Sequence, residues 1–376
     1  MRPLPRSHGS HHPRVLALAL LAFVVGTPTR AHAQAARIIP TQMCGDYFFV
    51  PIELGGDPDR TLWMILDTGA NETIVDPESV ERVSDANISA GQRVNLTNAT
   101  AGPLTYSRLP TRARDLDHLS LTLGREIDGI LGYNAFEDVL LTLDYPDREV
   151  RVGSGRLDRP NDATIFDTVR RTNRPFFPLR VGDRETLVLI DSGSRGGLTL
   201  DADVDWGWEH EPRLVGAAAR INRIELRWAG RAEDNAVFGR ALIETPIIDL
   251  TEGTQLIGTQ IMRHFELTFD QRSQRVRIVR SGDGPLSLPE RRGLGLVLRP
   301  VGEAFEIARV FGAGPGDKAG LEEGDVITHF DGLPVLNRGC EPRLGSRGDE
   351  TAMLRVTVRR GDDTFEADVE MGVLLQ

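Results

Sequence analysis

The sequence predicts a mainly β fold in which an internal duplication forms two similar lobes, followed by a small β-rich domain. Two apolar runs, Leu62–Ala70 and Leu187–Ser194, each contain an aspartate followed by a hydroxyl residue and a glycine. Further segments recur after these runs in the same order and at nearly the same spacing, which is typical of a duplicated unit. Short apolar stretches separated by turn residues favour strands over helices.

The spacing of the repeated segments defines the duplication. Leu141–Val152 aligns without gaps on Leu267–Ile278 at an offset of 126 (267 minus 141), and five of the twelve positions are identical. The two aspartates are 124 residues apart (191 minus 67). The glycines that end Ile130–Gly132 and Leu256–Gly258 are 126 apart (258 minus 132). Agreement among three separate segments is much stronger evidence than any one of them.

These repeats set the domain boundaries. We assign the first lobe to residues 37–154 and the second lobe to residues 162–279. Phe48–Phe49 before the first aspartate is matched by Phe176–Phe177 before the second. A turn-rich segment, Ser281–Pro285, then predicts a linker.

Strand signals in the first lobe lead directly to an acid. Tyr47–Leu54 alternates loosely, Gly55–Asp59 predicts a turn, and Thr61–Leu66 predicts a strand that ends at Asp67. A buried strand with an acid at its end and a glycine beyond presents the carboxylate to a cleft. Two such strands can bring Asp67 and Asp191 face to face.

The repeated pattern resembles the aspartic proteases, and its short lobes resemble the retropepsin-like branch of that family. The pattern is an apolar strand, Asp-Thr-Gly or Asp-Ser-Gly, and an apolar-apolar-Gly segment 65 residues later (132 minus 67), all repeated once. The resemblance covers Tyr47–Ile278 and implies a two-lobed β fold with Asp67 and Asp191 as the catalytic pair. It implies no metal and no organic cofactor.

The chemistry of this family explains why two acids are needed. Two neighbouring carboxylates cannot both ionise at low cost, so they share one proton and divide the roles of base and acid. The base takes a proton from a water molecule as it attacks a peptide carbonyl, and the acid protonates the carbonyl oxygen. The implied substrate is a peptide or protein.

The resemblance also implies supporting roles for neighbours of the acids. Thr68 and Ser192 would form hydrogen bonds to the opposite lobe, and Gly69 and Gly193 would let backbone N–H groups approach the carboxylates. Simple capping of the turns explains the same hydroxyl positions and stays open.

The two active-site loops differ at the next position, where the first has Ala70 and the second has Ser194. A Ser194 hydroxyl that donates to Asp191 would lower the pKa of that carboxyl. The other interpretation is that Ser194 only caps its turn.

A flap over the cleft would come, by the same resemblance, from Val94–Tyr106 in the first lobe. Tyr106 is then a flap aromatic or a plain surface or hinge residue. The equivalent stretch of the second lobe, Ala217–Trp228, shows no clear flap signature. We expect Ile130–Gly132 and Leu256–Gly258 to pack beneath the acid-bearing loops and to take no part in the chemistry.

Residues 286–374 resemble a PDZ domain of the kind attached to bacterial envelope proteases. Asp317–Ile327 followed by Asp331–Gly332 is the more specific part of the signature. The loop of Leu294, Gly295 and Leu296 stands where such domains bind a peptide carboxylate on backbone N–H groups, so a C-terminal peptide is a candidate partner there.

One segment of this domain departs from the PDZ pattern. Leu336–Thr351, which should form the helix that lines the peptide groove, contains three glycines and a proline. These residues disfavour a helix and put peptide capture by strand addition in doubt. Met353–Val358 and Phe365–Val369 are expected to close the domain as strands.

The N-terminus predicts export. Arg2, Arg6 and Arg14 precede the apolar run Val15–Val25, and Ala31–Ala33 supplies small residues at a cleavage point, so residues 1–33 form a predicted signal peptide. An uncleaved membrane anchor is the alternative, although the run is short for a bilayer. We expect a periplasmic or secreted protein.

Cysteine usage fits export without requiring it. The chain has two cysteines, Cys44 and Cys340, which either form a bridge in an oxidising compartment or remain two unpaired thiols.

Charge limits the partners. The chain has a formal net charge of -11, which argues against nucleic acid. We predict an exported aspartic endopeptidase. We expect it to be a monomer, because one chain supplies both acids. The alternatives are an idle peptide-binding protein that uses the cleft and the PDZ-like domain, and a tandem pair that needs dimerisation for activity.

Overall fold

Most of the described chain forms β-strands, which group into five sheets. The computed structural model describes residues 1, 36–84, 86–219, 224–336 and 353–375. All elements discussed below lie in the unit Ala33–Gln376. The predicted signal peptide beyond Met1, and the glycine-rich segment beyond Leu336, lie outside the described residues.

The first lobe is a seven-stranded sheet whose order is β2-β3-β4-β8-β5-β7-β6, and an additional β3–β6 pairing closes it into a barrel-like sheet. Predicted strand Tyr47–Leu54 is confirmed at its bounds as β3. The strands are β2 (Gln42–Cys44), β3 (Tyr47–Leu54), β4 (Asp57–Asp67), β5 (Thr73–Val75), β6 (Arg93–Ala101), β7 (Leu104–Ala113) and β8 (Gly129–Gly132).

The second lobe repeats the central pairings of the first. In each lobe the acid-bearing strand runs parallel to the strand of the apolar-apolar-Gly segment, as β4 with β8 and as β14 with β21. The strands of this sheet are β12 (Val169–Arg171), β13 (Arg174–Val181), β14 (Arg184–Ile190), β15 (Leu198–Asp201), β16 (Arg213–Ala219), β17 (Ile224–Arg231), β18 (Ala236–Phe238), β19 (Ala241–Glu244), β20 (Ile247–Thr251), β21 (Leu256–Ile257) and β24 (Leu286–Ser287).

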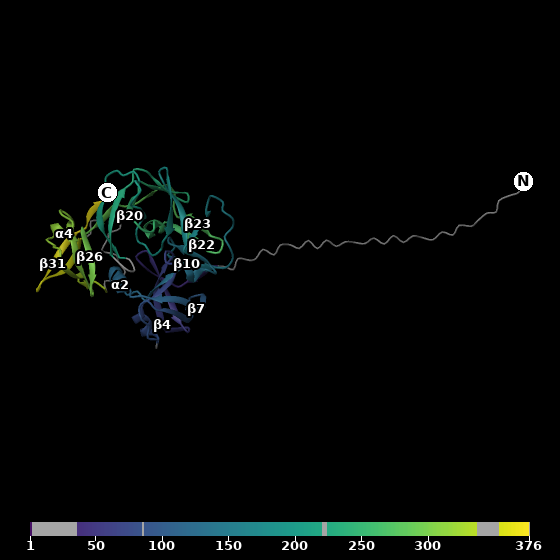
Figure 1. Cartoon of the computed structure of the whole chain (residues 1–376), viewed down its shortest axis with the longest axis horizontal. Coiled ribbons are helices and arrows are strands. Elements are labelled where there is room, and N and C mark those ends of the chain that lie inside the picture. The colour runs from purple at the N-terminus through teal and green to yellow at the C-terminus, as the bar shows by residue number, and fades with distance from the viewer. Residues whose placement is uncertain (2–35, 85, 220–223, 337–352, 376) are drawn as a thin grey trace. The chain divides into compact units, whose positions relative to one another are not determined.

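A third sheet joins the two lobes (Figure 1). Its order is β1-β10-β9-β22-β23-β11, so each lobe contributes three strands and β9 pairs antiparallel with β22 at the centre. The central pair consists of the two halves of the 126-residue repeat. The strands are β1 (Arg37–Ile39), β9 (Leu140–Asp144), β10 (Glu149–Gly153), β11 (Ile165–Asp167), β22 (Phe265–Asp270) and β23 (Arg275–Arg280).

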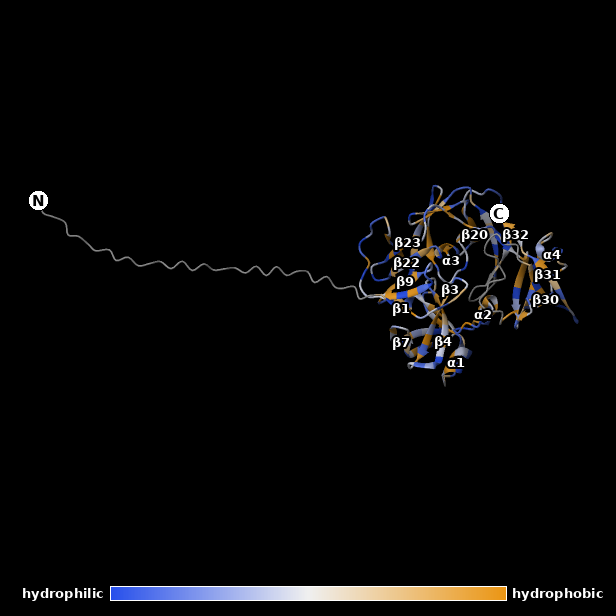
Figure 2. Cartoon of the chain, turned by 180° about the vertical axis from the view of Figure 1, so that it is seen from behind, coloured by the Kyte–Doolittle hydropathy of each residue, from blue (hydrophilic) through white to orange (hydrophobic). Residues whose placement is uncertain are grey.

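The C-terminal domain contains a six-stranded sheet and a separate two-stranded one. Buried and exposed residues alternate along β30, and Figure 2 shows hydrophobic and hydrophilic residues mixed along such strands. The strands are β25 (Arg291–Gly293), β26 (Leu296–Val301), β27 (Ala304–Val310), β28 (Val326–Phe330), β29 (Leu333–Pro334), β30 (Met353–Arg360), β31 (Asp363–Glu370) and β32 (Gly372–Leu375).

Helices are short and few among the described residues. They are α1 (Pro77–Val83), α2 (Asp117–Leu123), the 3-10 turn η1 (Tyr133–Phe136), α3 (Thr259–Met262) and α4 (Pro315–Lys318). None of the helices in the described ranges is long and apolar enough to cross a membrane. Helix α2 matters most for the site, because its Leu121 belongs to the same buried cluster as Leu294 and Phe305 of the C-terminal domain.

The second lobe extends beyond residue 279. Strand β24 pairs with β19 in the sheet of that lobe, and Leu286 and Leu288 are buried in the main core. The predicted linker Ser281–Pro285 therefore precedes the last strand of the second lobe, and the passage to the C-terminal domain comes near Pro289.

Cys44 ends strand β2 and is fully buried. It is disulfide-bonded, which excludes two unpaired thiols. The other cysteine of the chain, Cys340, lies outside the described residues.

Candidate active site

The two predicted acids come together at the ends of equivalent strands. Asp67 is the last residue of β4, and Asp191 directly follows β14. Leu66 and Ile190, the residues before them, are fully buried, so the cores of the two lobes fix where each strand ends. The Asp67 side chain is hydrogen-bonded to the Asp191 side chain.

Gly132 and Gly258 allow the apolar-apolar-Gly segments to pack closely against the backbone near the acid-bearing loops. A Cβ on Gly132 would lie 2.5 Å from the Glu72 carbonyl oxygen, and a Cβ on Gly258 would lie 2.5 Å from that of Gly196. These contacts confirm that the two apolar-apolar-Gly segments pack beneath the loops, where no side chain fits.

Thr68 and Ser192 form a crossed set of hydrogen bonds between the lobes. Thr68 Oγ1 donates to the Ile190 carbonyl at 2.7 Å and accepts from Ser192 N at 3.0 Å. In the same way, Ser192 Oγ donates to the Leu66 carbonyl at 2.8 Å and accepts from Thr68 N at 2.9 Å. Both hydroxyls are buried, so these bonds hold the two strand ends at a fixed separation. The predicted bridging geometry is confirmed.

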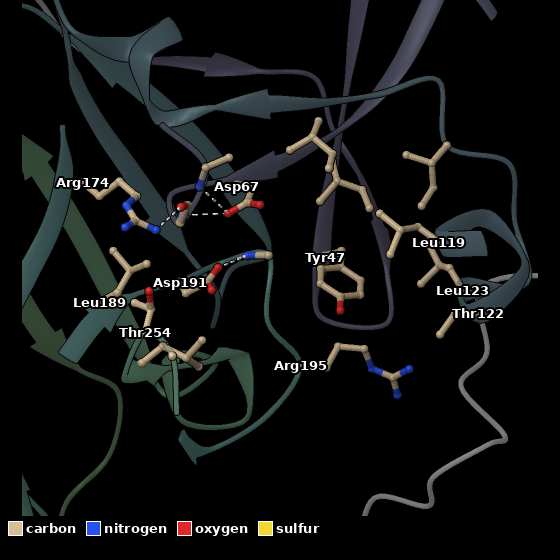
Figure 3. Close-up of a pocket in the computed structure, with 18 of the residues that line it drawn as sticks. Tyr47, Asp67, Leu119, Thr122, Leu123, Arg174, Leu189, Asp191, Arg195 and Thr254 are labelled. Carbon is tan, nitrogen blue, oxygen red and sulfur yellow. Dashed lines mark hydrogen bonds between the residues drawn. The ribbon is translucent and has the colours of Figure 1, made fainter. Parts of the chain in front are cut away.

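Backbone N–H groups donate to both carboxylates, and dashed lines in Figure 3 mark such hydrogen bonds at Asp67 and Asp191. Asp67 Oδ1 accepts from Gly69 N at 2.7 Å and from Ala70 N at 3.1 Å, while Asp191 Oδ1 accepts from Gly193 N at 2.9 Å. Each glycine also packs against the acid of the other lobe. A Cβ on Gly69 would lie 2.4 Å from Asp191 Oδ1, and one on Gly193 would lie 2.4 Å from Asp67 Oδ2.

Burial dominates the electrostatics of the pair. It raises the pKa of Asp67 above the usual aspartate value, while the hydrogen bond with Asp191, the N–H groups of Gly69 and Ala70, and the charge of Arg174 act in the opposite direction. A raised pKa favours a proton on Asp67 in the free protein.

Ser194 does not have the first of its two predicted roles. Among the described residues, no hydrogen bond joins its hydroxyl to either aspartate, and its N–H donates to the Asp191 carbonyl at 3.3 Å. Its carbonyl accepts from Thr259 N at 2.7 Å. Ser194 therefore belongs to the turn that supports the loop, and the hypothesis of a hydroxyl aimed at Asp191 is wrong.

A cavity of about 530 Å³ opens in front of the acids. Apolar side chains of β4, β8 and α2 form one wall, including Ile65, Ile130, Leu119 and Leu123. Apolar walls with a few charged groups are typical of ligand-binding cavities.

The flap expected from Val94–Tyr106 does not cover this cavity. These residues form the β6–β7 hairpin, whose end pairs with Glu53 and Leu54 of β3 and approaches Pro40 at Gly102. The hairpin closes the first-lobe sheet, and none of its residues lines the cavity. The physical reason is that β6 pairs with β3, so the backbone hydrogen-bonding groups at the end of the hairpin are used within the first-lobe sheet.

Tyr106, the residue considered as a flap aromatic, also lies outside the lining of the cavity. Its hydroxyl is buried, has no hydrogen-bond partner within the described part of the chain, and packs beside the main core. Burial raises the pKa of Tyr106. The residue does not line the cavity, so it is not a flap aromatic over the acids.

The second-lobe hairpin, in which no flap signature was found, borders the cavity. Strand β16 pairs with β17 from Arg213↔Ala229 to Ala219↔Ile224, and Glu225 of β17 lines the cavity. The stretch Ala217–Trp228 therefore borders the site despite its undistinguished sequence.

Three residues at the cavity escaped the sequence analysis: Tyr47, Arg174 and Arg195 (Figure 3). Arg174 Nη1 donates to the Gly69 carbonyl at 3.3 Å, so it reaches the active-site loop of the other lobe. Burial raises the pKa of Tyr47 to about 12, with Arg195 opposing this shift and Asp191 adding to it. The hydroxyl of Tyr47 consequently stays protonated.

Strand register reveals a signal for two of these residues. Phe49 pairs with Ile65, and Phe176 pairs with Leu189, each two residues before an acid. The lobes thus correspond at an offset of 127 here (176 minus 49), which replaces the predicted match of Phe48 with Phe176. At this offset Tyr47 is the counterpart of Arg174, so both come from one position of the repeat.

A second cavity of about 390 Å³ adjoins the first. Its lining includes the predicted carboxylate-binding loop of Leu294, Gly295 and Leu296, together with Ser194 and Gly196 of the second active-site loop. The structure therefore brings the candidate loop of the C-terminal domain close to the acid-bearing loops.

Asp76, Asp115 and Asp117 form the acidic cluster whose spacing could suit a metal ion within the described ranges, with ligand atoms within 4.8 Å of one another. Asp76 caps α1 by accepting from Ser79 N at 3.1 Å, and Asp115 accepts from Asp117 N at 2.9 Å. These bonds explain the cluster as capping, and it lines neither cavity.

Comparison with known proteins adds little to this geometry. No family model and no curated protein matches the chain. A solved structure titled photosystem II D1 C-terminal processing protease is similar over 23% of this chain and 24% of its own length, with 22% sequence identity and a TM-score of 0.20.

Proposed function

We propose that this protein is an exported aspartic endopeptidase that hydrolyses peptide bonds with the pair Asp67 and Asp191. The observation that carries the proposal is the contact between the two carboxylates, which Thr68 and Ser192 hold in place from opposite lobes. A structural ion pair joins an acid to a base. Two acids in contact, one of them with a raised pKa, are instead what catalysis by a shared proton needs.

The chemistry assigns one role to each acid. Asp191 takes a proton from a water molecule whose oxygen attacks the peptide carbonyl carbon, and Asp67 donates its proton to the carbonyl oxygen. This step forms a gem-diol. Asp191 then gives its proton to the amide nitrogen as the C–N bond breaks, and Asp67 recovers its proton from a hydroxyl of the gem-diol, so the products are an acid and an amine.

The residues around the acids fit these steps. The N–H groups of Gly69 and Gly193 stabilise the ionised forms, and the glycines leave no Cβ between the two acids. The apolar wall that includes Leu119 and Leu123 excludes water from a bound peptide. We further propose a peptide or protein substrate, a monomer, and a PDZ-like C-terminal domain that binds peptide ends.

The test is digestion of a denatured protein mixture by the purified protein at pH 3 to 8, with sequencing of the products. We expect new peptide ends at defined sites and the same pH dependence for all of them. Binding without new ends in the wild-type protein would instead favour the idle peptide-binding protein.

A further inference from the structure

Several residues that line the cavity at the acids are related in pairs by the repeat. A lining of equivalent pairs presents the same chemistry to the substrate residue on either side of the cleaved bond. Positions where the two lobes differ are therefore the ones that can distinguish these two residues. The matched pairs are Ile65 with Leu189, Gly69 with Gly193, and Ile130 with Leu256.

The first position that differs is the start of strands β3 and β13, where Tyr47 and Arg174 are counterparts. In Figure 3, Arg174 lies on one side of the two acids and Tyr47 lies on the other. One position of the repeat thus places a cation beside one half of the cavity and an uncharged aromatic ring beside the other half.

The second difference is the link that follows strands β7 and β20. These strands are equivalent, because β7 runs parallel to β5 and β20 runs parallel to β15. In the first lobe fifteen residues, 114–128, join β7 to β8 and include helix α2 (128 minus 113). In the second lobe four residues, 252–255, join β20 to β21 (255 minus 251). A short loop therefore takes the place of the helix.

Helix α2 makes the Tyr47 side of the cavity apolar. Leu119 and Leu123 line the cavity there, as Figure 3 shows, and together with Tyr47 they pack against the buried cluster that contains Ile65. On the Arg174 side, the loop 252–255 contributes Thr254 in place of these leucines. A large apolar side chain of a substrate therefore loses more contact with water on the Tyr47 side, which favours its binding there.

The side chain of Arg174 keeps donors for a ligand. Its Nε donates to Thr172 Oγ1 at 2.9 Å, its Nη1 donates to the Gly69 carbonyl at 3.3 Å, and its Cζ lies 5.5 Å from the centroid of the Phe176 ring. Within the described ranges this side chain makes no other hydrogen bond and no salt bridge. A guanidinium has further N–H groups, and a carboxylate is the partner that can accept from two of them at once.

Arg174 is also the cation that acts on the acids. Burial raises the pKa values of both Asp67 and Tyr47, and the charge of Arg174 opposes this for Asp67 while the charge of Arg195 opposes it for Tyr47. Figure 3 shows the Arg195 guanidinium directed away from the acids. Glu225 is the remaining charged residue of this lining. A negative group of a substrate beside the cleaved bond therefore finds its cation at Arg174.

We propose that this enzyme cleaves between an acidic residue, whose carboxylate binds Arg174, and a large apolar residue, whose side chain packs against Tyr47 and the leucines of α2. The two halves of the cavity thus select different residues although they come from one duplicated unit. This inference rests on the proposed function, because it names the substrate class of the same acids.

The first test compares four peptides on the wild-type protein. A site found by digestion supplies the flanking sequence, and the two residues at the cleaved bond are Leu-Glu, Glu-Leu, Leu-Gln or Gln-Leu. We expect kcat/KM for one of the two glutamate orders to exceed the other by at least about tenfold. Within the better order, glutamate should exceed glutamine by at least about tenfold, equivalent to about 1.4 kcal/mol.

The pH dependence of the glutamate preference tests whether charge is recognised. The glutamate of the free peptide has a pKa of about 4.3, whereas an arginine stays charged throughout. The ratio of kcat/KM for glutamate over glutamine should therefore be complete above about pH 5 and fall toward one as the pH decreases through about 4.3. A ratio that stays constant down to pH 3 would contradict binding of the ionised carboxylate.

Variants locate each half of the preference. Arg174→Gln should bring the glutamate-to-glutamine ratio to one or below, and a changed pKa of Asp67 affects both peptides alike and cancels in that ratio. Arg180→Gln removes the same charge from an exposed position of the same strand and should keep the ratio. Leu123→Ala should reduce the preference for leucine over alanine at the apolar position and leave the glutamate-to-glutamine ratio unchanged.

The outcomes separate this inference from the function beneath it. Wild-type protein that cleaves all four peptides equally well contradicts the inference and leaves the protease intact, whereas wild-type protein that cleaves no peptide contradicts the proposed function. If Arg174→Gln lowers kcat/KM for all peptides by one factor, Arg174 only supports the loop of Gly69 and the inference is wrong. The peptide and pH comparisons need no variant, so an Arg174→Gln protein that fails to fold leaves both tests in place.

Discussion

The hydroxyls of Thr142 and Thr268 lie 2.9 Å apart, and the two residues are separated by the 126 positions of the sequence repeat. They face each other in the β9–β22 pair. On either side of them, Leu143 pairs with Leu267, the repeat counterpart of Leu141, and Leu141 pairs with Phe269, the repeat counterpart of Leu143. Equivalent residues that pair antiparallel indicate a local two-fold relation between the lobes. Asp67 and Asp191 likewise stand at the ends of equivalent strands of the two lobes and contact each other.

The first prediction concerns the two acids. Asp67→Asn and Asp191→Asn should each lower kcat by about 10²–10⁴-fold, because an amide can neither accept nor share the proton. Circular dichroism should show a folded protein in both cases, since the amide has nearly the size of the carboxyl group. Asp203→Asn changes an exposed aspartate after β15 and serves as the control. Folded Asp67→Asn protein with wild-type turnover would disprove the role of the pair.

The second prediction concerns the crossed hydrogen bonds. Ser192→Ala leaves the buried Thr68 N–H and the Leu66 carbonyl without partners. We expect the free energy of unfolding in urea to fall by about 1–3 kcal/mol. Ser107→Ala, at an exposed position of β7, should change it by less than about 0.5 kcal/mol. Equal values for the two variants would mean that the bonds between the lobes contribute nothing.

The third prediction concerns pH. Arg174 lowers the pKa of Asp67 against the larger effect of burial, so Arg174→Gln should raise that pKa further. Because Asp67 must be protonated to act as the acid, activity should then persist to higher pH, and the alkaline limb of kcat/KM against pH should move upward. Arg180→Gln removes the same charge from an exposed position of the same strand and should leave that limb in place. A downward shift for Arg174→Gln would contradict the sign.

The fourth prediction concerns Ser194. Since its hydroxyl makes no hydrogen bond to either acid among the described residues, Ser194→Ala should leave the acid limb of the pH profile where it is in the wild-type protein. An acid limb that moves by one pH unit would correspond to about 1.4 kcal/mol and would restore the discarded hypothesis.

The fifth prediction concerns the domain boundary. Removal of residues 290–376 should leave a folded pair of lobes, although Leu121 becomes exposed and Asp249 loses Arg291. Removal of residues 285–376 also deletes buried Leu286 and Leu288 and should cost roughly 3–6 kcal/mol more. Urea unfolding of the two truncated proteins measures the difference. Equal stability would show that β24 does not belong to the second lobe.

Much of the site could be predicted because its determinants are local or repeated. An apolar strand that ends in an acid and a glycine defines where Asp67 and Asp191 stand, and the repeat defines that they belong together. The bridging roles of Thr68 and Ser192 also followed, since residues equivalent by duplication meet across a two-fold relation. The flap was misplaced because hairpin signals identify two strands without telling which other strand completes their pairing.

The sequence by itself determined the duplication, the strand ends and the two acids, because periodicity and spacing are properties of the chain alone. Only the tertiary structure decided what surrounds them. Tyr47 and Arg174 reach the acids from the opposite lobes, Leu121 joins the C-terminal domain, and the Leu294–Leu296 loop opens beside Arg195. Such contacts depend on how separate sheets pack, and a side chain's distance across a cavity leaves no periodic trace in the sequence.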